Sequence, residues 1–195
     1  MITIGRIPKK LHCFFRPVKN QVSGHVYAYF WSFVLAMCLS HGNTIDKLVK
    51  LLRNSPHRTN HGEFLWRSNW GESAVMQQIA LDLLCSLYHK KNRNLFFIID
   101  DTQTLKRAKK MDAVGKLFHH ASGKYGTGHT IVKVCLYYRG VTIPWASLLY
   151  VKQEHAGKLK LEFWKLTQLA GQAIRQAVLP DHFKITVLFD AFYLC

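Results

Sequence analysis

Acidic residues are scarce in this sequence, in which 11 Asp and Glu stand against 27 Lys and Arg, for a formal net charge of +16. The basic residues are spread along the chain rather than gathered in a tail, which indicates a folded basic surface. Such a surface suits a polyanion, and nucleic acid is the first candidate partner. An anionic membrane surface and a basic protein without a polyanionic partner are the alternatives. A hydrophobic content of 49% is enough for a core and argues against disorder.

Paired cysteines are also lacking. The five cysteines are odd in number, widely spaced and without a CxxC pair; they are Cys13, Cys38, Cys85, Cys135 and Cys195. This pattern argues against a disulfide framework or a zinc ribbon and suits a reducing compartment. The first residues, MITIGRIPKK, lack the apolar core and cleavage site of a signal peptide. We therefore expect a cytoplasmic, DNA-associated protein.

A long apolar run is missing as well. Residues 26–40 (VYAYFWSFVLAMCLS) are apolar over 15 residues, whereas a spanning helix needs about 20. We expect this segment to be a core helix and expect no membrane partner. A membrane-associated basic protein is the alternative interpretation of the segment.

The chain changes character near residue 92. Before it, apolar residues recur at helical spacing in 26–40, in 45–52 and in 73–89, which predicts an all-helical region over residues 1–92. The segment HRTNHGEF, between the second and third of these, is polar and is not assigned to a helix. Short helices on a basic chain permit a helix-turn-helix-like DNA reader around residues 44–70, although helical packing alone explains the pattern as well.

Residues 93–195 change to strand patterns. Predicted strands cover 95–100, 130–138, 141–150 and 183–190, and an amphipathic helix of about five to six turns covers Lys158–Val178. Arg139-Gly140 predicts a tight hairpin, and Pro144 predicts an edge position for its second strand. A flexible connection between strands is one interpretation of the loop 119–129 (HHASGKYGTGH), and contact with a DNA backbone through its amides and Lys124 is the other. The predicted order is therefore strand, strand, strand, helix, strand.

Two of these strands end in carboxylates. The helix before the last strand allows that strand to return parallel to the first, so that Asp101 and Asp190 meet at one end of the sheet. Carboxylate oxygens at an open sheet edge suit Mg²⁺ or Mn²⁺, which can serve phosphoryl transfer. A turn or a helix cap is the plain alternative for Asp-Asp-Thr. Because side chains alternate along a strand, only one of Asp100 and Asp101 should face the site.

The residues IIDDT (98–102), the segment 117–150 and ITVLFDAFYL (185–194) resemble insertion-sequence transposases of the DDE class, which have a ribonuclease H-like catalytic domain. The resemblance covers roughly residues 95–195, and residues 55–70 fit the N-terminal part of such proteins more loosely. It implies an incomplete ribonuclease H-like mixed sheet of β-β-β-α-β order after the helical region. It also implies Asp101 and Asp190 as catalytic metal ligands, with Asp100 as a neighbour that can stand in.

The family's third carboxylate, usually a Glu downstream of the second Asp, has no counterpart here. The four glutamates, Glu63, Glu72, Glu154 and Glu162, all precede Asp190. We therefore expect a C-terminally truncated transposase, largely inactive, whose complete form performs metal-dependent hydrolysis and strand transfer at transposon ends. Whether the chain is itself an enzyme is left open. A non-catalytic DNA-binding remnant that competes with an active transposase is the alternative.

Basic residues follow the first carboxylates and are candidates for contact with DNA: Lys106, Arg107, Lys109, Lys110 and, in the glycine-rich loop, Lys124. A solvated charged turn explains the first four equally well. The same loop lacks the GxxxxGK[ST] spacing of a phosphate loop. The histidines His119, His120 and His129 have no spacing that singles out a soft-metal site. We expect DNA ends and target DNA as partners, leave a homo-oligomer open, and expect no small-molecule substrate.

Overall fold

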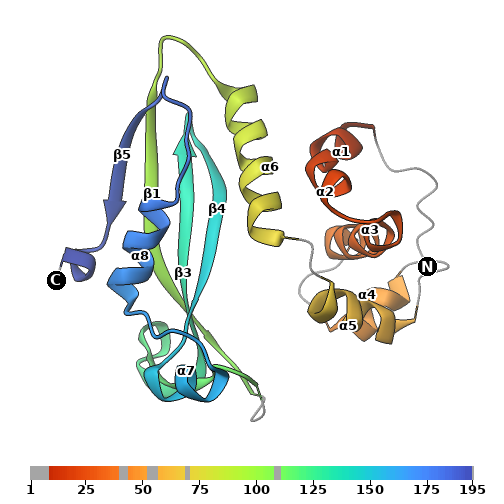
Figure 1. The fold of residues 1–195 in the computed structure, drawn as a ribbon, viewed down its shortest axis with the longest axis vertical. Helices are drawn as coiled ribbons and strands as arrows, with labels where there is room; N and C mark the ends of the chain where they lie inside the picture. The colour runs from red at the N-terminus through yellow and green to blue at the C-terminus, as the bar shows by residue number, and fades with distance from the viewer. Residues whose placement is uncertain (1–8, 40–43, 52–56, 69–70, 108–110, 195) are drawn as a thin grey trace. The chain divides into compact units, whose positions relative to one another are not determined.

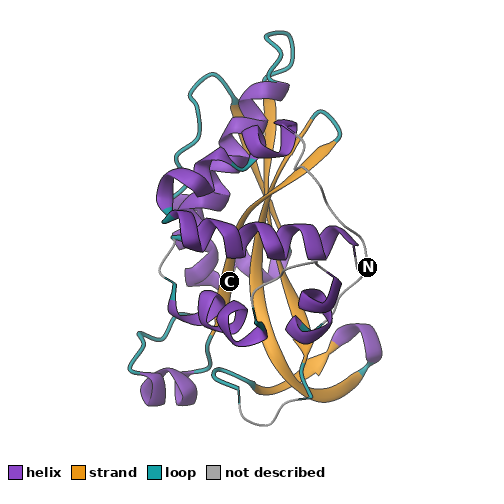
Figure 2. Ribbon diagram, turned by 90° about the vertical axis from the view of Figure 1, so that its right-hand side faces the viewer, coloured by secondary structure: helices purple, strands orange, loops and turns teal. Residues whose placement is uncertain are grey.

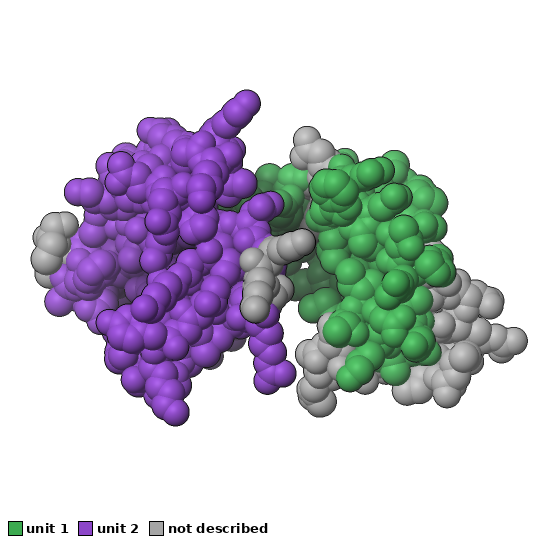
Figure 3. All heavy atoms as spheres, turned by 90° about the horizontal axis from the view of Figure 1, so that it is seen from below, with its two compact units in different colours: residues 1–79 green, residues 80–195 purple. Residues whose placement is uncertain are grey.

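The chain divides into two compact units, residues 1–79 and 80–195, coloured separately in Figure 3. The computed structural model describes residues 9–39, 44–51, 57–68, 71–107 and 111–194. The division falls within α6, after Ile79, which is 13 residues before the predicted boundary at residue 92. Among the described residues, no helix is both long enough and apolar enough to cross a bilayer.

The first unit is helical, as predicted. Its helices are α1 (Lys9–Phe14), α2 (Arg16–Gln21), α3 (Gly24–Leu39), α4 (Ile45–Leu51), α5 (Arg58–Arg67) and the start of α6 (Glu72–Leu87). The apolar segment 26–40 forms most of α3, which packs Tyr29 and Phe33 against Leu48 of α4 and Phe64 of α5. Residues 40–43 and 52–56, which precede and follow α4 in the sequence, lie outside the described residues.

Most of the polar segment HRTNHGEF, which sequence reasoning did not assign to a helix, belongs to helix α5. His61 and Phe64 are the two buried residues of this helix, and they pack among the rings of Tyr29 and Phe33. Two buried positions three residues apart are enough to anchor a short helix through one narrow stripe. The high average polarity of the segment concealed this stripe, so sequence reasoning did not detect the helix.

The second unit holds one mixed sheet with the helices α7 (Gln153–Leu159) and α8 (Leu166–Arg175), shown in Figures 1 and 2. Its strands are β1 (Asn94–Leu105), β2 (Gly115–His119), β3 (Lys124–Tyr138), β4 (Val141–Tyr150) and β5 (Lys184–Phe189), with short 3-10 helices at His120–Ser122 and Ala191–Leu194. β3 runs antiparallel to β1, and β5 runs parallel to β1, so the mixed α/β class and the predicted return of the last strand are confirmed. Among the described strands β4 pairs only with β3, which confirms the edge position of Pro144.

One face of this sheet carries the core of the unit. Leu95, Phe97 and Ile99 alternate along β1 and pack with every second residue of β3 from Val132 to Tyr138. Ala80 and Leu84 of α6 belong to the same buried cluster, as do Leu169, Ala170 and Ala173 of α8. The opposite face carries exposed Asp100, Lys133 and Tyr137, and Ile185, Leu188 and Phe189 of β5 are also exposed.

The strand β1 is longer than predicted. It continues through both carboxylates to Leu105, because residues 101–105 pair with 128–132 of β3. Close approach of the two strands requires a glycine at Gly128, where a Cβ atom would collide with the backbone carbonyl of Thr104. The carboxylates therefore lie inside β1, at the level where its partner β5 stops.

Two further interpretations of the sequence are wrong. The loop 119–129 is ordered structure: β2 precedes it, a 3-10 turn covers His120–Ser122, and β3 begins at Lys124. The single helix Lys158–Val178 is two helices. Lys160 has a positive φ of 55° that ends α7, and the backbone N–H of Lys165 donates to Gln168 Oε1 at 2.8 Å where α8 begins. Glu162 lies in the connection and not in a helix.

Tyr138 joins the end of α6 to the sheet. Its hydroxyl donates to the carbonyl of Asn92 at 2.6 Å and accepts from the backbone N–H of His89 at 3.0 Å. Tyr138→Phe leaves both backbone groups without this partner, and we expect the free energy of unfolding to fall by about 1–2 kcal/mol. Urea denaturation followed by circular dichroism measures the loss. Tyr137→Phe, at the exposed neighbouring position, is the control; equal losses for the two variants would contradict the account.

Candidate active site

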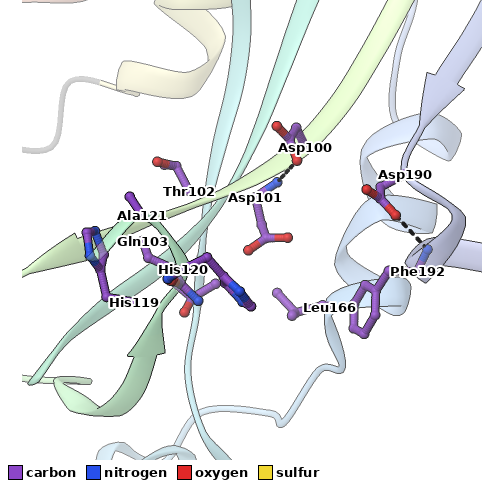
Figure 4. Close-up of a pocket in the computed structure, with 11 residues that line it drawn as sticks. Asp100, Asp101, Thr102, Gln103, His119, His120, Ala121, Leu166, Asp190 and Phe192 are labelled. Atoms are coloured by element: carbon purple, nitrogen blue, oxygen red, sulfur yellow. Dashed lines mark hydrogen bonds between the residues drawn. The ribbon is translucent and has the colours of Figure 1, made fainter. Parts of the chain in front are cut away.

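An open cavity of about 650 Å³ lies where β5 ends beside β1. Three acidic residues are among those that line it: Asp100 and Asp101 of β1, and Asp190, which directly follows β5. Thr102, Gln103 and Thr130 line it from the sheet, His119, His120 and Ala121 from the turn after β2, and Leu166 and Phe192 from the later part of the chain. Figure 4 shows ten of these residues labelled, with Asp101 and Asp190 on different sides of the cavity.

The parallel register brings the carboxylates together. Ile99 is paired with Phe189 at the end of the β1–β5 ladder, so the next residues of the two strands are Asp100 and Asp190. Neighbouring strands lie about 5 Å apart. Asp101, the following residue of β1, lines the same cavity as Asp190, although the two are far apart in sequence.

Alternation along β1 separates Asp100 from Asp101. Asp101 follows Leu95, Phe97 and Ile99 on the core side and is half-buried, whereas Asp100 is exposed. One carboxylate oxygen of Asp100 accepts a hydrogen bond from the backbone N–H of Asp101 at 2.8 Å, and the two side chains point in opposite directions in Figure 4. The structure thus confirms that the two carboxylates face different ways.

Asp190 is held by the turn that follows β5. Its Oδ1 accepts from the backbone N–H of Phe192 at 3.0 Å, which fixes the side chain at the start of the last 3-10 helix. Its second carboxylate oxygen is not used in that bond.

Tyr193 is a site residue that sequence reasoning missed. Its hydroxyl donates to Asp101 Oδ1 at 3.4 Å, across 92 residues of sequence. The pKa of this phenol is raised above its ordinary value, first by burial and then by the negative charges of Asp101, Asp100 and Asp190. Besides burial, the shift thus reflects the negative charge of three acidic residues in a chain that is otherwise basic.

Sequence reasoning also did not predict the contact between Gln103 and His120. Gln103 lies two residues after Asp101 on the same side of β1, and its Oε1 accepts from the backbone N–H of His120 at 3.2 Å. This bond ties the turn after β2 to the carboxylate strand. In Figure 4 the ring of His120 projects toward Leu166, whereas that of His119 lies apart from the carboxylates. Period-two alternation beyond Asp101 was the signal that could have found Gln103.

Of the predicted DNA-contacting residues, Lys106, Arg107 and Lys124 lie outside the cavity lining. Lys106 follows β1 directly, and its backbone N–H donates to the carbonyl of Thr127 at 2.8 Å. Arg107 and Lys124 are exposed. Lys109 and Lys110 lie outside the described residues.

The oxygen donors of this cavity suit a hard cation. Within the described ranges, however, no three His, Cys, Asp or Glu side chains are grouped closely enough to hold a metal ion, and this includes the histidines of the β2–β3 turn. Mg²⁺ is commonly bound by one or two carboxylates together with water and substrate phosphates. Asp101 and Asp190 fit that smaller protein contribution.

A protein-family model described as "DDE superfamily endonuclease" matches residues 33–194. The matched range contains all the residues that line the cavity. No curated protein and no solved structure matches the chain.

The raised pKa of Tyr193 predicts an alkaline effect. Because the folded chain holds this proton more tightly than the unfolded chain, the contribution of Tyr193 to stability is complete below about pH 10 and is lost as the pH rises toward the folded pKa. Asp101→Asn removes one of the negative charges, so we expect Tyr193 to ionise at lower pH. Tyrosinate absorbance, taken as the difference from a Tyr193→Phe counterpart, measures this shift.

Asp181→Asn is the control for this titration, since it removes an exposed carboxylate that is not among the causes of the shift. An equal shift in the Asp181→Asn and Asp101→Asn proteins would show that Asp101 has no particular effect on Tyr193.

Proposed function

This chain belongs to the DDE superfamily of endonucleases, and from that premise we propose that it is a transposase-type enzyme of DNA. The reaction is metal-dependent hydrolysis and strand transfer of phosphodiesters at transposon ends. The single observation that supports it most is the convergence of Asp101 and Asp190, from the parallel strands β1 and β5, on one cavity.

Asp101 and Asp190 are the proposed ligands of Mg²⁺ or Mn²⁺. Such a cation, when bound with the substrate phosphate, supplies activation of a water or hydroxyl and neutralises charge on the leaving oxygen. The chain itself fixes the positions of these two carboxylates. Tyr193 holds one oxygen of Asp101, the Phe192 amide holds one oxygen of Asp190, and the β1–β5 ladder sets their separation.

The basic surface is the proposed complement to this acidic cavity. Phosphates of the DNA backbone are attracted by the net charge of +16. Lys106, Arg107 and Lys124, with Lys109 and Lys110, are the proposed contacts with the DNA backbone. The helical unit, with α4 and α5 in succession, is proposed to contact DNA as well.

Cleavage by these residues alone is proposed to be slow. The DDE resemblance implies three carboxylates, and the cavity is lined by Asp residues without any Glu. Too few ligands leave the position of a metal loosely defined, and metal position sets the in-line geometry of the reaction. The second candidate function, a DNA-binding competitor without catalysis, is favoured by the same incomplete donor set.

Nicking of supercoiled plasmid in the presence of Mn²⁺ tests the chemistry. We expect slow nicking by the wild-type chain and a loss in Asp101→Asn that exceeds the roughly 10–100-fold cost of losing an outer-shell partner of a metal. Asp100→Asn removes the same charge from the other face of β1 and should keep most of the activity. Equal rates for wild type and Asp101→Asn, with DNA binding retained, would favour the competitor function instead.

Mn²⁺ binding in the absence of DNA tests the ligands separately from the reaction. Titration calorimetry should show that Asp101→Asn and Asp190→Asn each weaken Mn²⁺ binding by about 10-fold or more. Asp100→Asn is again the charge-matched control and should change the affinity less. If all three variants lose the same affinity, the cation is attracted by total charge and is not held by the two proposed ligands.

A further inference from the structure

A row of rings leads away from the carboxylate cavity along the β2–β3 hairpin. His120 lines the cavity, and its ring centroid lies 5.4 Å from that of Phe118. The Phe118 ring lies 5.2 Å from that of Tyr125, and Lys116 Nζ lies 5.0 Å from the centre of the Tyr125 ring. We call Lys116, Phe118, His120 and Tyr125 the hairpin row.

Strand register explains why these side chains share a face. Phe118 of β2 is the direct cross-strand partner of Tyr125 of β3, and Lys116 precedes Phe118 by two residues. Residues two apart on a strand point to the same side, and paired residues of antiparallel strands do so too. The row is therefore a regular feature of the hairpin, anchored at the cavity end by the bond between Gln103 and the His120 amide.

The two aromatic rings are not part of the core. Tyr125 is 71% exposed and Phe118 is 40% exposed, and neither belongs to the buried cluster of this unit. Single exposed aromatic residues are common on protein surfaces. Two exposed rings in contact, with the Lys116 ammonium group over one of them and the cavity nearby, indicate a binding surface.

Charge indicates the chemistry of that partner. Residues 113–153, which include the whole hairpin, contain no Asp or Glu, whereas Lys116, Lys124 and Lys152 all lie in this range. Lys152 Nζ donates to the carbonyl of Lys116 at 2.6 Å, so it lies at the same hairpin. Exposed rings set among cations are the usual surface for unpaired nucleotides, whose bases stack on rings while their phosphates meet the cations.

We propose that the hairpin row binds an unpaired DNA strand, with Tyr125 stacking on a base next to the nucleotide whose phosphate lies at the Asp101–Asp190 cavity. The placement beside the cut rests on the proposed function; the stacking itself does not. Phe118 supports the Tyr125 ring from its edge, and Lys116 and Lys124 contact the flanking phosphates. Duplex DNA cannot make the same contact, because its bases are already stacked on one another.

Fluorescence anisotropy with labelled oligo(dT), alone or annealed to oligo(dA), tests this in EDTA, where metal-dependent cleavage is absent. We expect Tyr125→Leu to weaken binding of the single strand by about 10-fold and binding of the duplex by less than about twofold. Tyr125→Phe keeps the ring and should stay within about twofold of wild type. Because Tyr125 is exposed, its variants should fold normally, which circular dichroism checks.

Tyr137→Leu is the matched control, since Tyr137 is a 38% exposed tyrosine near the other end of β3. Unchanged binding of oligo(dT) by Tyr125→Leu would overturn the proposal. So would equal loss for single strand and duplex, equal loss in Tyr125→Phe, or a self-association of the chain that only Tyr125→Leu abolishes while oligo(dT) affinity is kept.

The outcome of the oligo(dT) binding experiment can be distinguished from the outcome of the nicking experiment that tests the proposed function. If plasmid nicking depends on Asp101 while oligo(dT) binding is indifferent to Tyr125, the hairpin proposal alone is wrong. If oligo(dT) binding depends on Tyr125 while nicking is indifferent to Asp101, the stacking surface stands and the catalytic assignment is wrong.

Discussion

The parallel ladder between β1 and β5 is the contact on which the rest of the second unit depends. Six paired positions, from Asn94 with Lys184 to Ile99 with Phe189, join segments that are about 90 residues apart in sequence. Parallel pairing needs a crossover connection, which α7 and α8 provide, and α8 buries Leu169, Ala170 and Ala173 in the same core as β1. The core thus fixes the ladder, and the ladder brings Asp190 level with Asp100, so that Asp101 and Asp190 line the same cavity.

That placement concentrates negative charge in a chain that has little of it. The elevated pKa of Tyr193 results first from burial and then from the negative charges of three neighbouring carboxylates. A divalent cation is the simplest group that neutralises such negative charge, and the basic residues of the chain supply the complementary attraction for phosphates. The acidic cavity, the exposed lysines and the hairpin row together form a surface suited to one ligand, a DNA strand.

Topology was predictable from the sequence where local signals were strong. The Arg139-Gly140 turn, the edge position of Pro144 and the return of residues 184–189 beside β1 all follow from local patterns combined with the rules of chain crossing. The different orientations of the Asp100 and Asp101 side chains could be predicted from the alternation of side chains along a strand. The break between α7 and α8 was missed because Leu159, Phe163 and Leu166 continue the helical spacing through it, while the positive φ of Lys160 leaves no mark in composition.

The site itself was only half predictable. Asp101 and Asp190 could be proposed because each comes at the end of an apolar run of strand residues, whereas Tyr193 acts through a bond to Asp101 that no local pattern encodes. β2 was missed because Gly115–His119 is short and adjoins a glycine-rich segment that reads as a loop. With β2 unrecognised, the pairing of Phe118 with Tyr125 could not be foreseen.

The central claim is that Asp101 and Asp190 share one divalent cation. Anomalous diffraction at the manganese edge from crystals of the chain grown with Mn²⁺ and a DNA strand tests it most directly. The account predicts one strong peak between the carboxylates of Asp101 and Asp190. A peak bound by Asp100 without Asp101, or one at the histidines of the β2–β3 turn with none at Asp190, would contradict it.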